Sequence, residues 1–74
     1  MIKVHLSKFM GIHKENIKSL HDKTGLNRNT LSNLYHEKVK RVDFDTLERL
    51  CEFFDCQPGD LLEYIPDEEN DDGV

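Results

Sequence analysis

The stretch that decides the fold covers residues 17–35, IKSLHDKTGLNRNTLSNLY. Apolar side chains recur at helical spacing at its start and predict a helix there, with Asn16 as the N-cap. Gly25 is expected to end this helix, because glycine accepts the left-handed conformation that a chain needs just past a helix end. A second helix, capped by Asn27, is predicted over residues 28–36. Two helices joined by a short turn that contains glycine form a helix-turn-helix.

Apolar residues at fixed offsets hold the two helices of such a motif together. Leu20 can pack from the first helix onto the second, and Leu26 follows the glycine as an apolar plug in the turn. The side chains expected to face the core are Ile17, Leu20 and Thr24 in the first helix, Leu26 in the turn, and Leu31, Leu34 and Tyr35 in the second helix. Two consecutive helices can meet this pattern by chance, so the outward face of the second helix must be considered as well.

The outward side chains of that second helix are all able to form hydrogen bonds, and none is acidic or apolar. They are Asn27, Arg28, Asn29, Thr30, Ser32, Asn33 and His36. Asparagine is a mediocre helix former, so three of them around one short helix have a natural explanation if they read another molecule. Arginine pairs with guanine and asparagine with adenine at base edges in the major groove. We therefore expect base contacts from Arg28, Asn29 and Asn33; the alternative is that Asn27 is only a cap and the others are solvated.

A basic loop follows the predicted helix-turn-helix. Its cations are Lys38, Lys40 and Arg41. We expect them to contact phosphates, which positions a protein on DNA without reading sequence, and the alternative is a solvated loop. His36, near the end of the preceding helix, is also placed to approach a phosphate.

The rest of the chain predicts an all-α bundle of five helices. Helical spacing indicates a first helix near residues 5–12, a fourth helix capped by Asp43 and a short fifth turn that starts at Pro58. Their inward-facing residues are expected to be Leu6, Phe9 and Met10, then Phe44, Leu47, Leu50, Cys51 and Phe54, and finally Leu61 and Leu62.

The two ends of the bundle leave an alternative open. Residues 1–4 alternate apolar and polar side chains and could form a short strand, and residues 62–65 could be extended and pair with it. Pro66 ends the predicted domain, which covers residues 1–66. Residues 67–74 form an acidic tail that we expect to be disordered.

The charges are distributed unevenly along the chain. The formal net charge is −5, and the tail alone accounts for it with five acidic residues and no basic one. The predicted domain is therefore neutral, but residues 14–41 carry +4 and residues 42–65 carry −6. A surface with one side facing phosphates would produce this asymmetry, whereas scattered solvated charge is the alternative.

Composition argues against several other classes of protein. The chain has no run of about 18 apolar residues and no secretory signal, so we expect a soluble, cytoplasmic protein with no membrane partner. Cys51 and Cys56 are too few for a zinc site and are expected to pack as small hydrophobic residues. No two histidines stand four residues apart, and none has an obvious nucleophile beside it. We therefore expect no metal, no cofactor, no small-molecule ligand and no enzymatic activity.

The chain resembles the small Cro/repressor-type helix-turn-helix regulators, which are lambda-repressor-like and XRE-like. Residues 17–69 carry the resemblance: the helix-turn-helix, the basic loop, the segment DFDTLERLC and the ending QPGDLLEY. The resemblance implies a five-helix bundle that binds operator DNA sequence-specifically, usually as a homodimer on a palindromic site. We therefore expect a regulator of transcription that acts as a repressor. Residues at base-reading positions of the family are Arg28, Asn29 and Asn33. Residues where the family commonly contacts phosphates are Asn27, Thr30, Ser32, Lys38, Lys40 and Arg41.

Two positions depart from the pattern of this family. His21 stands where a small residue usually allows the two helices to cross closely, so its side chain must angle outward or the crossing must open. Ile17 replaces a glutamine that contacts phosphate in many relatives, so that contact is not expected here. These departures and the neutral domain favour one alternative function: a protein-interaction module of the same fold that binds another regulator or a toxin through its acidic fourth and fifth helices and its tail.

Overall fold

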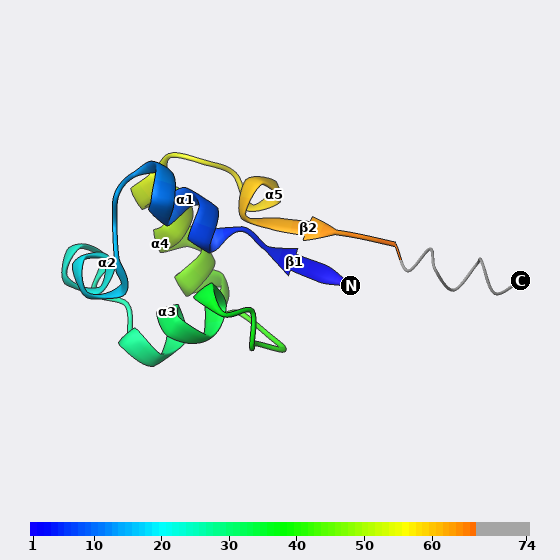
Figure 1. Ribbon diagram of the computed structural model, residues 1–74, viewed down its shortest axis with the longest axis horizontal. Coiled ribbons are helices and arrows are strands. Elements are labelled where there is room, and N and C mark those ends of the chain that lie inside the picture. Colours follow the sequence, from blue (N-terminus) through cyan, green and yellow to red (C-terminus); the bar gives the residue numbers. More distant parts are fainter. Residues whose placement is uncertain (67–74) are drawn as a thin grey trace, which may run out of the picture.

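Within the part of the chain that the structure describes, residues 1–66, five helices are framed by two short strands (Figure 1). The computed structural model gives the elements in the order β1 (Ile2–Val4), α1 (Leu6–Ile12), α2 (Ile17–Thr24), α3 (Arg28–Tyr35), α4 (Phe44–Phe54), α5 (Pro58–Leu61) and β2 (Leu62–Tyr64). The predicted five-helix bundle is confirmed, and α2 and α3 form its helix-turn-helix. The predicted tail at residues 67–74 lies outside the described residues.

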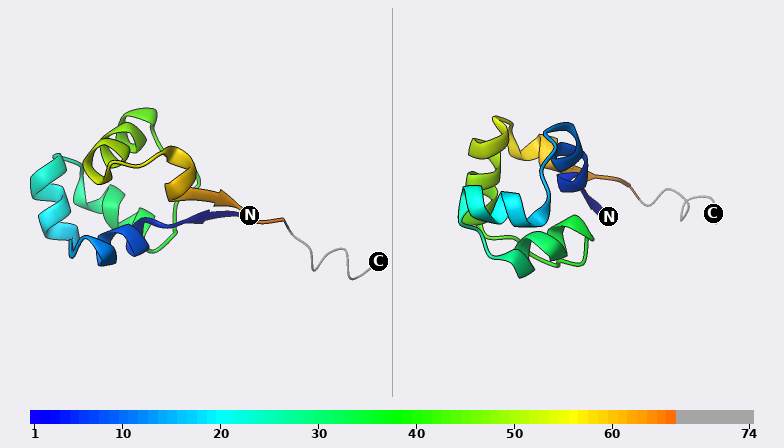
Figure 2. Two further views of the ribbon diagram at one scale, coloured as in Figure 1. Left: turned by 90° about the horizontal axis from the view of Figure 1, so that it is seen from above. Right: turned by 60° about the vertical axis from the view of Figure 1, so that its left-hand side comes forward.

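The two strands join the two ends of the domain. They pair antiparallel, with Ile2 opposite Tyr64 and Val4 opposite Leu62. The N-terminal amino group of Met1 donates a hydrogen bond to the carbonyl oxygen of Ile65 at 2.7 Å, which extends the pairing. The pair lies at the end of the molecule away from α2 (Figure 2). Of the two alternatives left open for residues 62–65, the extended one is therefore confirmed.

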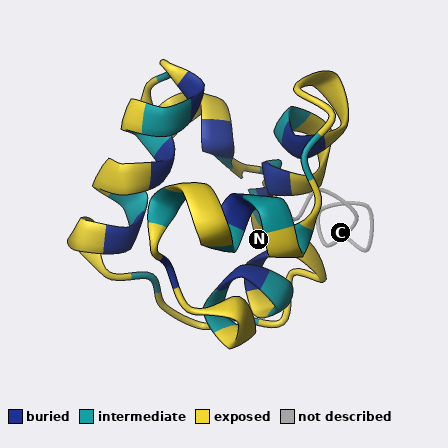
Figure 3. Ribbon diagram, turned by 90° about the vertical axis from the view of Figure 1, so that its left-hand side faces the viewer, coloured by how far each residue is buried: buried dark blue, intermediate teal, exposed yellow. Residues whose placement is uncertain are grey.

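Side chains from all five helices meet in one core. Leu6, Leu20, Leu31 and Leu61 are almost completely buried and come from α1, α2, α3 and α5. Leu50 and Phe54 of α4 are buried with them, and the Phe54 ring lies 5.6 Å from that of Phe9 between centroids. The buried segments of each helix face the interior, while the outer faces are exposed (Figure 3). A core this small leaves the orientation of each helix dependent on a few side chains.

Two residues expected in the core are exposed, so these predictions are wrong. Tyr35, the last residue of α3, is 42% exposed and packs edge-on against the ring of His36. Phe44, the first residue of α4, is 87% exposed. The buried line of α4 runs through Thr46, Leu50 and Phe54, with Leu47 and Cys51 half-buried at its flank. Phe44 is the first residue of α4 and Tyr35 the last of α3, so each lies at a helix end.

The C-terminal end of α4 holds the two cysteines. Asp55 adopts a left-handed conformation there, and the N–H of Cys56 donates a hydrogen bond to the carbonyl oxygen of Cys51 at 3.0 Å. This arrangement brings the two residues into the contact that usually accompanies such helix ends. Both thiols are free and half-buried, and burial raises the pKa of Cys56 to about 11. They pack as small hydrophobic residues, as predicted.

Among the described residues, no helix has the length and apolar character needed to cross a membrane.

Candidate nucleic-acid interface

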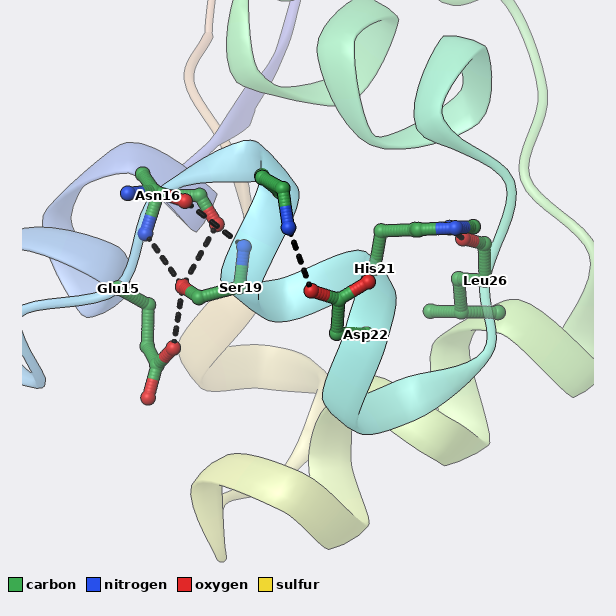
Figure 4. Close-up of polar contacts among 7 residues, drawn as sticks. Glu15, Asn16, Ser19, His21, Asp22 and Leu26 are labelled. Atoms are coloured by element: carbon green, nitrogen blue, oxygen red, sulfur yellow. Dashed lines mark hydrogen bonds and ion pairs between the residues drawn. The ribbon is translucent and has the colours of Figure 1, made fainter.

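The first helix of the motif starts at a reciprocal cap. The Asn16 side chain accepts a hydrogen bond from the Ser19 N–H at 2.7 Å, and the Ser19 hydroxyl accepts one from the Asn16 N–H at 2.9 Å (Figure 4). The same hydroxyl donates to Glu15 at 2.6 Å, and Lys23 pairs with Glu15 at 2.9 Å. Both partners lower the pKa of Glu15, and the hydrogen bond from Ser19 has the larger effect. The predicted Asn16 cap is confirmed, and it fixes where α2 begins.

The turn between α2 and α3 depends on glycine. Gly25 has a φ of 77°, and its N–H donates to the carbonyl oxygen of His21 at 2.8 Å, which closes the end of α2. Leu26 then turns its side chain into the core. The Thr24 hydroxyl donates to the carbonyl oxygen of Leu20 and accepts from the N–H of Leu26. The polar groups of the turn are thereby satisfied within the turn, and the path of the chain into α3 is held.

His21, one of the two departures from the family pattern, makes a contact across the same turn. Its ring nitrogen Nδ1 lies 2.6 Å from the carbonyl oxygen of Leu26, and Figure 4 shows the ring extended toward that carbonyl. Because a carbonyl oxygen can only accept, Nδ1 must carry the proton. The imidazole therefore lies along the turn and contributes a hydrogen bond there.

A cation from α4 supports the turn from the other side. Arg49 Nη1 donates to the carbonyl oxygen of Thr24, the last residue of α2, at 3.2 Å. The carbonyl groups at the end of a helix have no partners within it and carry partial negative charge, so a guanidinium is favourable there. Arg49 also lies 3.5 Å from Asp45 on its own helix. Local sequence pattern carries no signal of this contact, because the two partners are 25 residues apart.

Asn27 is the N-cap of α3, the second helix of the motif, as predicted. Its side-chain oxygen accepts hydrogen bonds from the N–H groups of Asn29, at 2.7 Å, and Thr30, at 3.3 Å. The helix ends at Tyr35, one residue before the predicted end, and His36 occupies the C-cap. Because the cap occupies the amide oxygen of Asn27, only its NH₂ group is free to donate to another molecule.

The side chains predicted to read bases lie on the exposed side of α3. Arg28, Asn29 and Asn33 are all exposed, and Asn33 follows Asn29 by about one helical turn. Within residues 1–66, the structure gives these three side chains no hydrogen-bond or ion-pair partner. Their polar groups therefore face solvent and are free to bind another molecule.

The side chains predicted to contact phosphates surround this group. Asn27, His36, Lys38, Lys40 and Arg41 are exposed, whereas Thr30 and Ser32 are half-buried. Thr30, Asn33 and Arg41 line one hollow of about 160 Å³ between α3, the loop that follows it and the start of α4, where Asp43 also lies. The structure thus brings the basic loop next to the polar face of α3, although Arg41 is 8 residues from Asn33 and 11 from Thr30 in the chain.

Glu37 interrupts the basic segment but does not face the same way. It has a left-handed backbone with a φ of 57°, and its carboxylate accepts from the Val4 N–H at 3.1 Å and from Lys3 Nζ at 3.3 Å. Both bonds lower the pKa of Glu37, and the bond from Val4 has the larger effect. The acid ties the loop to β1, so the cations of the loop remain without an acidic partner among the described residues. No local pattern in the sequence indicates this role, because Glu37 and Val4 are 33 residues apart.

Comparison with known proteins places the molecule in a family. The model of the Cro/C1-type HTH DNA-binding domain matches residues 5–67. The chain belongs to this Cro/C1-type family. A protein of Bacillus subtilis (strain 168), described as the uncharacterized HTH-type transcriptional regulator YozG, is 34% identical over 66 residues, which cover 89% of this chain and 79% of that protein. No solved structure matches the chain significantly.

Membership of the Cro/C1-type family confirms the resemblance that residues 17–69 indicated. It supports a DNA-binding regulator, and nothing in these comparisons supports the alternative of a protein-interaction module.

Proposed function

We propose that this protein is a sequence-specific DNA-binding regulator of transcription, acting as a repressor, that places α3 in the major groove. The observation that carries the proposal is the exposed side of α3. Its polar side chains have no partners within residues 1–66, and a loop of free cations lies beside them. Three asparagines in and around an eight-residue helix cost helix stability, and base recognition explains why they are there.

Arg28, Asn29 and Asn33 are proposed to read bases. Arg28 and Asn29 lie in the first turn of α3, and recognition helices concentrate their base contacts in that turn. The guanidinium presents two parallel donors to guanine, and an asparagine amide presents a donor and an acceptor to adenine. Asn33 continues the same face by one turn.

A second group of side chains is proposed to hold the DNA backbone. The group consists of Asn27, Thr30, Ser32, His36, Lys38, Lys40 and Arg41. Lys and Arg side chains that neutralise phosphates release counterions, so binding weakens with salt by a slope of about 0.9 per phosphate in logarithmic units. Replacing both Lys38, which lies outside the groove beside β1, and Arg41 with glutamine should therefore weaken binding to every sequence and lower that slope by about 2.

The protein is further proposed to bind as a homodimer on a palindromic site. A single short recognition helix covers less surface than specific protein–DNA complexes bury. Two copies related by a two-fold axis double the contact and read two half-sites that lie about 34 Å apart.

Selection from a pool of random duplex DNA tests the proposed function. Wild type should enrich a motif of two half-sites, and the Arg28→Ala/Asn29→Ala variant should lose it, because each good base contact is worth about 1–3 kcal/mol. Lys8→Ala is the matched control, since it also removes one exposed cation but lies on α1. Enrichment that persists in the double variant, or no enrichment by wild type, would overturn the proposal.

A further inference from the structure

The strand pair presents an apolar ledge to solvent. Side chains alternate along a strand, so Ile2 and Val4 of β1 lie on the same face as Tyr64 and Leu62, their partners in β2. Met1 and Ile65 exchange both backbone hydrogen bonds. The next pair, Ile2 and Tyr64, is therefore of the non-hydrogen-bonded kind, in which the two side chains lie nearer each other than in a hydrogen-bonded pair. Ile2 is 57% exposed and Tyr64 69% exposed, so the tip of the ledge is uncovered.

An apolar groove lies directly beside this ledge. Its volume is about 340 Å³, and one wall is the ledge itself. Leu34 at the end of α3 and the loop residues Val39 and Val42 line the rest of its apolar surface. A protruding apolar pair and an apolar recess thus stand side by side on one surface.

The rim of the groove carries charges of both signs. Lys40 and Arg41 lie on the loop side together with Glu37, whose carboxylate is bound to β1. Glu63 lies on the strand side, where its side chain is 54% exposed and pairs with His5 at 2.7 Å. In a contact with two-fold symmetry, the same patch meets itself, so each half must find its complement within that patch. This surface meets the requirement in shape, because the ledge can enter the recess. It also meets the requirement in charge, because Glu63 of each copy can face Lys40 of the other while Arg41 stays beside α3.

We propose that this surface, the ledge and groove together, is where a second copy of the chain docks in solution. Each copy inserts its Ile2–Tyr64 pair into the groove of the other about a two-fold axis. The inference rests on the homodimer of the proposed function and names its interface. The groove includes Leu34, so the axis passes close to the C-terminal end of α3 in both copies. The two recognition helices therefore lie on either side of the axis, as a palindromic site requires.

The other exposed apolar surface does not fit a second copy. Phe44 stands over a hollow with Leu47 and the two cysteines, but the charged residue that lines this hollow is Glu48. A two-fold contact there would bring like charges together and leave them without a complement. The strand face is therefore the one suited to self-association.

Sedimentation equilibrium without DNA tests the interface. Wild type should be a dimer, and Ile2→Thr/Tyr64→Thr should raise the dimer dissociation constant by about tenfold or more, as loss of two central apolar anchors does. Threonine favours strands and adds no charge, so strand pairing and overall electrostatics are kept. Ile12→Thr is the matched control, because Ile12 is 64% exposed but lies on α1, outside the groove. Far-ultraviolet circular dichroism checks that each variant is folded. If the double variant does not fold, the single Tyr64→Thr variant replaces it in the test.

Each outcome decides the proposal. A dimer in wild type and Ile12→Thr that dissociates in the ledge variants supports the interface. A wild-type monomer at concentrations on the order of 1 mM, or a dimer that the ledge variants do not weaken, overturns it. Because no DNA is present, the result is independent of base reading. A monomer that still enriches a DNA motif removes only this inference, whereas a dimer that enriches none removes only the proposed function.

Discussion

Replacement of Gly25 with alanine should destabilise the fold through backbone strain alone. The residue has a φ of 77°, in the left-handed region where a Cβ meets the following carbonyl at a cost of about 1–2 kcal/mol. An added Cβ would lie 3.5 Å from Arg49 Nη1, which is ordinary van der Waals contact. No clash with a neighbour therefore adds to the strain, and the expected loss of unfolding free energy is about 1–2 kcal/mol.

Gly11→Ala provides a control with the opposite sign. Gly11 lies inside α1 with an ordinary helical backbone, and a Cβ there would meet no atom within 4 Å. Alanine restricts the unfolded chain more than glycine does, so this substitution should stabilise the protein by about 0.5–1 kcal/mol. The two variants make the same chemical change and differ only in the backbone conformation that receives it.

Urea unfolding followed by far-ultraviolet circular dichroism measures both variants. Their unfolding free energies should differ by roughly 1.5–3 kcal/mol, and in a domain of this size each 1 kcal/mol corresponds to about 4–8 °C in Tm. The reasoning would be refuted if Gly25→Ala were as stable as wild type, or if both alanine variants shifted in the same direction. Gly25→Asn should fall between wild type and Gly25→Ala, because asparagine visits the left-handed region more readily.

Three other substitutions give distinct expectations. Asn27→Ala should lower the unfolding free energy by about 1 kcal/mol, measured by thermal unfolding, because two N–H groups of α3 lose their acceptor. Asn27→Asp should keep the cap, so equal losses in the two variants would argue against capping. The stability that the Glu37 carboxylate contributes is present above pH 4.5, its ordinary pKa, and is lost as the pH falls through the lower pKa of the folded state. Glu37→Gln should therefore show a smaller loss of unfolding free energy on acidification than wild type, and an equal loss would contradict the bonds to β1. In a Cys51→Ser background, native Cys56 should react with iodoacetamide at neutral pH more slowly than in the unfolded chain, because burial, the largest cause of its raised pKa, remains when Cys51 is replaced; equal rates would contradict this.

The recognition face was accessible to sequence analysis because its signals are local. The caps at Asn16, Gly25 and Asn27 involve backbone groups at most four residues away. A short stretch of sequence therefore contains both partners of each cap. The spacing of polar side chains on α3 is likewise set by the helical repeat, and Arg28, Asn29 and Asn33 lie exposed where the pattern placed them. The contact of these residues with DNA stays a prediction until the selection experiment is done.

Helix periodicity was less reliable at helix ends. Periodicity indicates which side chains share a face of a helix, but it does not indicate how far the neighbouring elements extend along that face. Tyr35 and Phe44 lie on apolar stripes and yet remain exposed, whereas Leu34 and Thr46 in the same helix turns are buried. Burial at a helix end therefore depends on which neighbouring elements reach that side chain.

The sequence by itself determined the helix-turn-helix, its caps and its polar face, because these follow from interactions between neighbours in the chain. Only the tertiary structure decided how the two ends of the domain pair, how Glu37 ties the loop to β1 and how Arg49 supports the turn. The partners in these contacts are 25 to 64 residues apart. Their meeting depends on the packing of the whole core, and no local pattern records it. The ledge and groove beside α3 exist for the same reason, since β1, β2 and the loop meet only after the chain has folded.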